Sequence, residues 1–263
     1  MSKITLTIDD KQIESSQGST VLEAAKEAGM YIPTLCHHQS LAPFGGCRLC
    51  VVEIDRVRGF PTACTTPAND GMVVKTDSKQ LQEFRRGVLE LILTETRHVC
   101  LICPADGRCE LQTVSNYVGV KGITLPHTFK EQPVYADDPF FDRDYSLCIL
   151  CGRCVRVCQE VRGAGVLAFT YRGSQSLVGT AFGRSLMDSG CQFCGACVDV
   201  CPTGSLMERS RKWSGPSVDR DVLTTCPYCG VGCQLRLGTK DDKIIEVIPD
   251  AKNEVNRGQA CVK

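Results

Sequence analysis

The chain has 263 residues, with 30 basic and 30 acidic side chains, four histidines and 19 cysteines. A formal net charge of zero argues against a nucleic-acid-binding protein, which usually carries a clear basic excess. No run approaches the roughly 20 apolar residues of a transmembrane segment, and the N-terminus lacks the apolar core of a secretion signal. We therefore expect a cytoplasmic protein, in which clustered cysteines indicate metal or redox sites rather than disulfides.

The N-terminal part follows the element order of a β-grasp ferredoxin domain. Residues 3–8 alternate like a strand, and a second strand begins at residues 11–14. Thr20 and Glu23 occupy the N-cap and N3 positions of a capping box. This pattern predicts a short helix that ends near Gly29, followed by a loop rich in glycine and cysteine.

The first cysteine group has the spacing C-x10-C-x2-C-x13-C. Its members are Cys36, Cys47, Cys50 and Cys64. A Cys-x2-Cys pair with two further cysteines from flanking loops is the ligation style of a [2Fe–2S] cluster. The glycine pair that precedes Cys47 would let backbone N–H groups approach the sulfides. Zinc is the alternative, because thiolates suit both metals; the β-grasp order favours iron–sulfur.

Residues 79–96 show apolar side chains at helical spacing, which predicts a helix with one face in the core. The predicted apolar face consists of Leu81, Phe84, Val88, Leu91 and Ile92. Gly87 in the middle of this helix costs about 1 kcal/mol relative to alanine. We therefore expect a packing reason for it.

The second metal group has the form H-x-C-x2-C-x5-C and follows this helix. It consists of His98, Cys100, Cys103 and Cys109. The three cysteines lack a fourth thiolate, so His98 is the candidate fourth ligand of a [4Fe–4S] cluster. The alternative is that His98 is only a solvated residue at the helix end. One imidazole in place of a thiolate removes a negative charge and should raise the potential of the cluster.

Residues 122–146 hold three prolines and predict an extended connector. Residues 147–206 then contain two C-x2-C-x2-C-x3-C runs about 43 residues apart, the spacing of bacterial two-cluster ferredoxins. In such runs the fourth cysteine ligates the other cluster. This exchange assigns one [4Fe–4S] cluster to Cys148, Cys151, Cys154 and Cys201, and the other to Cys191, Cys194, Cys197 and Cys158.

Residues 207–222 are polar and predict a linker to a final small unit. That unit carries the fifth group, Cys226, Cys229, Cys233 and Cys261, whose spacing suits a further [4Fe–4S] site. Two alternating runs around Asp241 and Asp242 predict a β-hairpin. Lys263 follows two residues after Cys261, and composition alone would make it a plain terminal lysine.

The predicted fold class is α+β, with one [2Fe–2S] and four [4Fe–4S] clusters. Its parts are a β-grasp [2Fe–2S] ferredoxin domain (1–78), a helical [4Fe–4S] segment with one His and three Cys ligands (79–121), a connector with a two-cluster bacterial ferredoxin-like domain (122–207) and a small β-hairpin [4Fe–4S] domain (220–263). There is no G-x-G-x-x-G fingerprint and no Walker A motif, so the chain shows no place for NAD or flavin.

These motifs resemble those of known families. Residues 1–206 resemble the iron–sulfur module of the large iron–sulfur subunit of complex I and the diaphorase subunit of NAD-coupled [NiFe]-hydrogenases. The shared elements are the first cysteine group, the His98 group ending in CELQ, and DPFFDRDYSLCILCGRCVRVC. Residues 223–263, with TTCPYCGVGCQLRL and NRGQACVK, resemble molybdopterin enzymes of the formate dehydrogenase and nitrate reductase class. Both halves in this order resemble the N-terminal portion of the α subunit of NAD-coupled formate dehydrogenases.

The resemblance implies an electron-transfer subunit or segment of a formate dehydrogenase complex, with no catalytic residue in this chain. A Mo/W-bis-pterin would lie on a pterin-containing catalytic chain, and FMN and NAD(P) on a diaphorase-type partner. Lys263 would lie between its cluster and a pterin and assist electron transfer. The family continues well past this point, so the chain is either a separate subunit or a fragment. The alternatives are a subunit of an NAD-coupled or bifurcating hydrogenase, and a zinc-stabilised scaffold.

Overall fold

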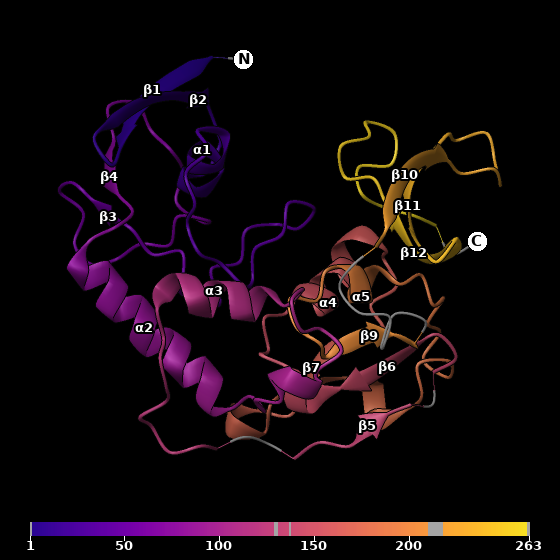
Figure 1. Ribbon diagram of the computed structural model, residues 1–263. Helices are drawn as coiled ribbons and strands as arrows, with labels where there is room; N and C mark the ends of the chain where they lie inside the picture. Colours follow the sequence, from indigo (N-terminus) through magenta and orange to yellow (C-terminus); the bar gives the residue numbers. More distant parts are fainter. Residues whose placement is uncertain (1, 129–130, 137, 210–217, 262–263) are drawn as a thin grey trace. The chain divides into compact units, whose positions relative to one another are not determined.

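The computed structural model describes residues 2–128, 131–136, 138–209 and 218–261 (Figure 1). The chain divides into two compact units. The first comprises Met1–Arg97 and Glu110–Lys130, and the second comprises His98–Cys109 and Glu131–Lys263. None of the helices in the described ranges has the length and apolarity needed to cross a membrane.

The first unit is built on a mixed four-stranded sheet with the strand order β2-β1-β4-β3. Strand β1 pairs antiparallel with β2 and parallel with β4, which is the arrangement expected of a β-grasp domain. The elements are β1 (Lys3–Ile8), β2 (Lys11–Ser16), α1 (Val21–Glu27), β3 (Glu53–Ile54) and β4 (Val73–Lys75). The predicted hairpin and the helix after it are therefore confirmed.

The capping box at the start of α1 is also confirmed. The Glu23 N–H donates to the Thr20 hydroxyl at 3.2 Å, and the Thr20 N–H donates to the Glu23 carboxylate at 2.7 Å. This satisfies two of the N–H groups that a helix start leaves without partners. The helix packs Val21, Leu22 and the alanines behind them into the core of the sheet.

Helix α2 (Lys79–Thr94) forms where predicted and buries Leu81 as predicted, but the rest of its buried face is not the predicted one. The buried stripe repeats every four residues and consists of Leu81, Arg85, Leu89 and Leu93. Of the residues placed in the core by their apolarity, Phe84 is 36% exposed and Leu91 is 58% exposed. The prediction failed because a charged residue, Arg85, stands at the centre of the buried face.

Gly87 has no packing role in this helix, so that expectation is wrong. It is exposed, and a Cβ built on it would meet no atom within 4 Å. Gly87→Ala should therefore raise the free energy of unfolding by about 1 kcal/mol, because alanine loses less backbone entropy in a helix. Urea denaturation followed by far-UV circular dichroism would measure the change. Gly29→Ala is the control: its φ of +73° predicts a loss of stability, and destabilisation by Gly87→Ala would contradict the argument.

Helix α3 (Glu110–Val118) completes the first unit and packs against α2 (Figure 1). The ring of Tyr117 stacks edge-on against Tyr31, with 4.7 Å between the centroids. Between α2 and α3 the chain leaves this unit at Arg97 and returns at Glu110.

The second unit contains sheet structure where the sequence predicted an extended connector. Strands β5 (Val134–Tyr135) and β6 (Phe141–Asp144) pair with β9 (Leu206–Glu208) in a sheet of order β5-β6-β9. The connector prediction is wrong for these residues because the prolines flank short strands. Phe141 is 2% exposed and belongs to the core that surrounds two of the cysteine groups.

Short elements make up the rest of the ferredoxin-like part. They are η1 (Cys100–Ile102), η2 (Tyr145–Leu147), α4 (Arg153–Arg156), η3 (Val157–Val161), β7 (Ala168–Thr170), η4 (Gly173–Gln175), β8 (Leu177–Gly179), η5 (Ala181–Gly183) and α5 (Ala196–Asp199). Strands β7 and β8 form an antiparallel pair between the two cysteine runs.

The C-terminal part is a three-stranded antiparallel sheet formed by β10 (Arg220–Thr225), β11 (Gln234–Lys240) and β12 (Lys243–Pro249), orange to yellow in Figure 1. The predicted hairpin is confirmed: Asp241 and Asp242 connect β11 to β12, both with positive φ. The sequence did not predict β10. The predicted linker was residues 207–222, of which 210–217 lie outside the described residues. Its first residues belong to β9 and its last residues to β10.

Candidate metal centres

The first cysteine group comes together in the loops of the β-grasp unit. Cys36, Cys50 and Cys64 are fully buried, and Cys47 is half-buried. The Cys47 N–H donates to Cys36 Sγ at 3.3 Å, and the Leu35 N–H donates to Cys47 Sγ at 3.4 Å. Backbone donors that point at sulfur favour the thiolate form, which is the form that binds metal.

The four thiols interact in two pairs, and this shapes their protonation. The hydrogen bond with Cys36 lowers the pKa of Cys47 and raises the pKa of Cys36. Cys50 and Cys64 behave in the same way, with the pKa of Cys64 lowered and that of Cys50 raised. Within each pair, one thiol is therefore more easily deprotonated than the other.

Gly45, two residues before Cys47, allows the backbone to pass close to Thr65 and to Cys64. Gly45 has a φ of +69°, and a Cβ there would lie 3.2 Å from the Thr65 methyl group. Its N–H is among the donors that lower the pKa of Cys64. The sequence predicted that the glycine pair would let backbone N–H groups approach the sulfides of a cluster. In the structure the Gly45 N–H is directed at the sulfur of Cys64.

The second group lies in the second unit, on the loop between α2 and α3. A Cβ on Gly204 would lie 3.0 Å from Cys103 Sγ, and Cys109 Sγ lies 3.6 Å from the Pro202 carbonyl oxygen. The loop therefore packs on the turn that follows Cys201, a member of another cysteine group. His98 and Cys100 are exposed, and the ligand role of His98 stays a prediction.

His98→Cys tests this site. A thiolate in place of the imidazole adds negative charge, so we expect the [4Fe–4S] cluster to be retained with a lower potential. An anaerobic redox titration followed by EPR would measure it, with His127→Cys as a control outside the group. Loss of about four Fe per chain would mean that the site requires imidazole for its shape. An unchanged potential would contradict ligation by His98.

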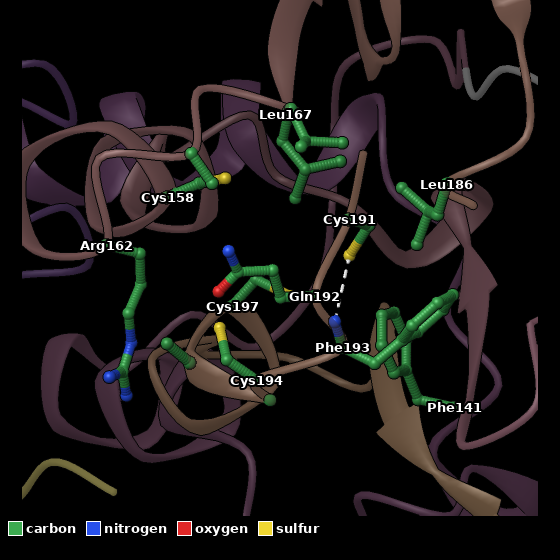
Figure 2. A pocket seen from close by; sticks show the side chains of 14 residues that line it. Phe141, Cys158, Arg162, Leu167, Leu186, Cys191, Gln192, Phe193, Cys194 and Cys197 are labelled. Carbon is green, nitrogen blue, oxygen red and sulfur yellow. Dashed lines mark hydrogen bonds between the residues drawn. The ribbon is translucent and has the colours of Figure 1, made fainter. Parts of the chain in front are cut away.

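The two cysteine runs surround two pockets, each lined by cysteines from both runs. One pocket is lined by Cys158, Cys191, Cys194 and Cys197. The other is lined by Cys148, Cys151, Cys154 and Cys201. Figure 2 shows the first, in which the sulfurs of Cys158, Cys191 and Cys194 face the middle of the pocket. Each pocket brings together three cysteines of one run and the fourth cysteine of the other run.

The repeat in sequence is also a repeat in backbone geometry. Leu150 and Phe193 have φ of 52° and 51°, and their N–H groups donate to Cys148 Sγ and Cys191 Sγ, each at 3.4 Å. Gly152 and Gly195 then take φ of 74° and 73° at the starts of α4 and α5. Positive φ at Leu and Phe is uncommon and was not predicted. Its recurrence at the same step of both runs indicates a loop shaped to point N–H groups at sulfur.

The chemistry of the two pockets fits iron–sulfur clusters. Burial raises the pKa of Cys151 to about 12 and also raises the pKa of Cys154 and Cys197. A buried thiolate needs nearby positive charge, which iron supplies. Among the described residues, no three His, Cys, Asp or Glu side chains form a site for a single metal ion.

The fifth group is held by the C-terminal sheet and one buried asparagine. The Cys226 N–H donates to the Cys233 carbonyl at 2.8 Å, which closes the loop between β10 and β11. The Asn256 side chain accepts from the Gln234 N–H and donates to the carbonyls of Gln234 and Gln259, all within 3.1 Å. Asn256, which no sequence motif singles out, thus ties the segment leading to Cys261 next to Cys233. Lys263 lies outside the described residues.

Four protein-family models match along the chain. They are the 2Fe-2S iron-sulfur cluster binding domain (residues 1–79), the NADH-ubiquinone oxidoreductase-G iron-sulfur binding region (85–124), the ferredoxin-like domain of NADH-quinone oxidoreductase subunit 3 (138–207) and the molybdopterin oxidoreductase Fe4S4 domain (219–263). They confirm domains of both the [2Fe–2S] and the [4Fe–4S] kind.

Curated relatives match nearly the whole chain. A subunit of an NADH-quinone oxidoreductase of Rhizobium meliloti is 38% identical over 99% of this chain. The α subunit of the NADPH-Fe(3+) oxidoreductase of Geobacter sulfurreducens is 35% identical over 98% of it. The chain spans about 30% of the length of each.

A solved structure of an NAD+-reducing [NiFe]-hydrogenase contains a chain with the same fold. It is 34% identical to this chain, with a TM-score of 0.74, and the match covers 81% of this chain and 90% of that one. This structural match and the order of the matched domains together show which family the chain belongs to. The chain belongs to the family of iron–sulfur subunits that resemble the large iron–sulfur subunit of complex I and occur in NAD(P)-linked oxidoreductases.

Proposed function

We propose that this chain is an electron-transfer segment with five iron–sulfur clusters. The [2Fe–2S] cluster would be held by the Cys36 group, and four [4Fe–4S] clusters by the His98 group, the two pockets and the Cys226 group. The single observation that carries the proposal is the exchange of fourth cysteines between the two pockets. Each run contributes to both sites, so the two clusters would lie close enough for fast electron exchange.

The turn after Cys201 supports a further step in the route. Cys201 lines one pocket, while Cys103 and Cys109 pack on the Pro202–Gly204 turn directly behind it. Cys201 would be a ligand of one proposed cluster, and the turn joined directly to it contacts two cysteines of the His98 group. Only a few covalent bonds therefore separate the two proposed sites. The clusters supply one-electron chemistry when bound; the chain's part is to position them and to set their potentials.

Iron content tests the number of clusters. The five sites predict about 18 Fe per chain, with matching acid-labile sulfide, after anaerobic reconstitution. A value near half of that would overturn the five-cluster proposal. A colourless protein that binds zinc and no sulfide would favour the alternative of a zinc-stabilised scaffold.

Within this class we propose that the chain serves a formate dehydrogenase complex, between a pterin-containing catalytic chain and a flavin- and NAD(P)-binding partner. The match of residues 219–263 to the molybdopterin oxidoreductase Fe4S4 domain supports a pterin enzyme on one side. The relatives are named as NADH- and NADPH-linked oxidoreductases, which supports a flavin- and NAD(P)-binding partner on the other side. Lys263 would assist electron transfer between the Cys226 group and the pterin.

A hydrogenase subunit is the second candidate, favoured by the fold shared with the NAD+-reducing hydrogenase. That match covers 81% of the chain, while the oxidoreductase relatives cover 98–99% of it. The deciding experiment adds formate, H2 or NAD(P)H anaerobically to the native complex and follows cluster reduction by EPR. We expect reduction by formate and by NAD(P)H. Reduction by H2 but not by formate would favour the hydrogenase, and reduction by NAD(P)H alone would overturn both assignments.

A further inference from the structure

Arg85 is a charged side chain at the centre of the buried face of α2, with an exposed fraction of 0%. Arginine is almost never fully buried unless it is paired, and a buried charge without a counter-charge is expensive. The adjacent buried positions of the helix are leucines, so packing alone does not require a charge at this point.

Two donors of the guanidinium fix the backbone on either side of Cys50. Arg85 Nε donates to the Leu49 carbonyl at 3.1 Å, and Nη2 donates to the Val51 carbonyl at 2.7 Å. The carbonyl of Cys50 itself accepts from the Ala63 N–H at 2.8 Å on the other side. Arg85 therefore satisfies two backbone carbonyls of this segment, as the N–H groups of a neighbouring strand would, and holds Cys50 in a defined position.

The third guanidinium nitrogen, Nη1, and the charge have no fixed partner among the described residues. Nη1 is buried without a hydrogen-bond acceptor, and no carboxylate in the described part of the chain forms an ion pair with Arg85. Burial lowers the pKa of Arg85, although an arginine stays protonated in proteins. The groups that act on it at longer range are Tyr117, Asp77, Cys50 and Asp9. Of these, Cys50 belongs to a proposed cluster site.

We infer that Arg85 is the internal counter-charge and a positioning residue for the [2Fe–2S] cluster proposed at the Cys36 group, an inference that rests on that cofactor assignment. Four thiolates make such a cluster negative, and reduction adds one more negative charge. A fixed positive charge at short range, poorly screened by solvent, stabilises the reduced state more than the oxidised one. Arg85 therefore raises the reduction potential of this cluster.

The test compares three variants in the full chain with its clusters in place. Arg85→Met removes the charge and the donors, and Arg85→Lys keeps the charge but loses the two-pronged geometry. Arg86→Met is the matched control, because it removes an exposed charge from the next position of the same helix, where solvent screens it. An anaerobic redox titration would follow the [2Fe–2S] EPR signal at a temperature that broadens the fast-relaxing [4Fe–4S] signals.

We expect Arg85→Met to shift the [2Fe–2S] midpoint to more negative potential, Arg85→Lys to shift it less, and Arg86→Met to leave it at the wild-type value. A wild-type midpoint in Arg85→Met, with the signal retained, would overturn the inference. If Arg85→Met loses the cluster, Arg85→Gln is titrated in its place, because its amide NH2 group keeps a hydrogen-bond donor without the charge. A wild-type midpoint in Arg85→Gln would then overturn the inference. A wild-type chain without any [2Fe–2S] signal would refute the cofactor assignment itself, which is a different outcome.

A purely structural arginine gives a different result. It would lower stability when replaced but would leave the midpoint of the retained cluster unchanged. Loss of the signal from all the Arg85 variants, with the rest of the iron unchanged, would support the positioning role and overturn tuning by charge alone.

Discussion

Replacing Cys158 and Cys194 together by alanine is expected to remove one [4Fe–4S] cluster, about four Fe per chain. Replacing Cys151 and Cys158 together should remove two clusters, about eight Fe per chain. The reason is that Cys158 lines the pocket of Cys194, although it belongs to the run of Cys151 in the sequence. Iron and acid-labile sulfide, measured after identical anaerobic purification, would decide the count.

The two double variants are controls for each other. If each run held its own cluster, the losses would be reversed: two clusters for the first pair and one for the second. Both variants remove two thiols from the same core, so a general loss of stability would lower their iron content alike. Equal losses would therefore contradict both arrangements and indicate a collapse of the ferredoxin-like part.

Leu89→Ala should lower the free energy of unfolding of the first unit by about 2–5 kcal/mol, the range for truncating a buried leucine. Leu89 is 0% exposed in the core face of α2. Leu91, two residues further on the same helix, is 58% exposed, and Leu91→Ala should change stability by no more than about 0.5 kcal/mol. Urea denaturation, followed by the visible circular dichroism of the [2Fe–2S] cluster, would measure both.

This pair also tests the observed face of α2 against the predicted one. The apolar pattern of the sequence placed Leu91 in the core and left Leu89 out of it. A larger loss from Leu91→Ala than from Leu89→Ala would mean that the helix presents the predicted face. Equal losses would mean that the helix is covered on both sides in the assembled protein.

Spacing defined the candidate cysteine groups, and local signals were sufficient to predict α1 and the C-terminal hairpin. The capping residues Thr20 and Glu23 determine a helix start through their own hydrogen bonds, so they can be read without knowledge of the fold. The hairpin follows from the Asp241-Asp242 turn for the same reason. These features depend on residues that are close together in the sequence.

The features that could not be predicted depend on partners distant in the sequence. Arg85 lies in the core because its acceptors are carbonyls 34 and 36 residues away. Strand β6 forms because β9 lies beside it more than 60 residues later, with Phe141 opposite Glu208. The Asn256 side chain likewise donates to the carbonyl of Gln234, 22 residues earlier in the chain. Composition carries no signal for such pairings.

The exchange of cysteines has a consequence for the order of biosynthesis. Residues 148–154 emerge from the ribosome with three of the four cysteines of one proposed site, yet that site stays incomplete until Cys201. The other site begins with a single thiol, Cys158, and becomes complete at Cys197. Both proposed sites therefore become complete only when the last few residues of the second run are translated, which takes about a second or less at ordinary rates of translation. A ribosome that stalls between the two runs would leave four unligated thiols exposed to oxidation or to the wrong metal.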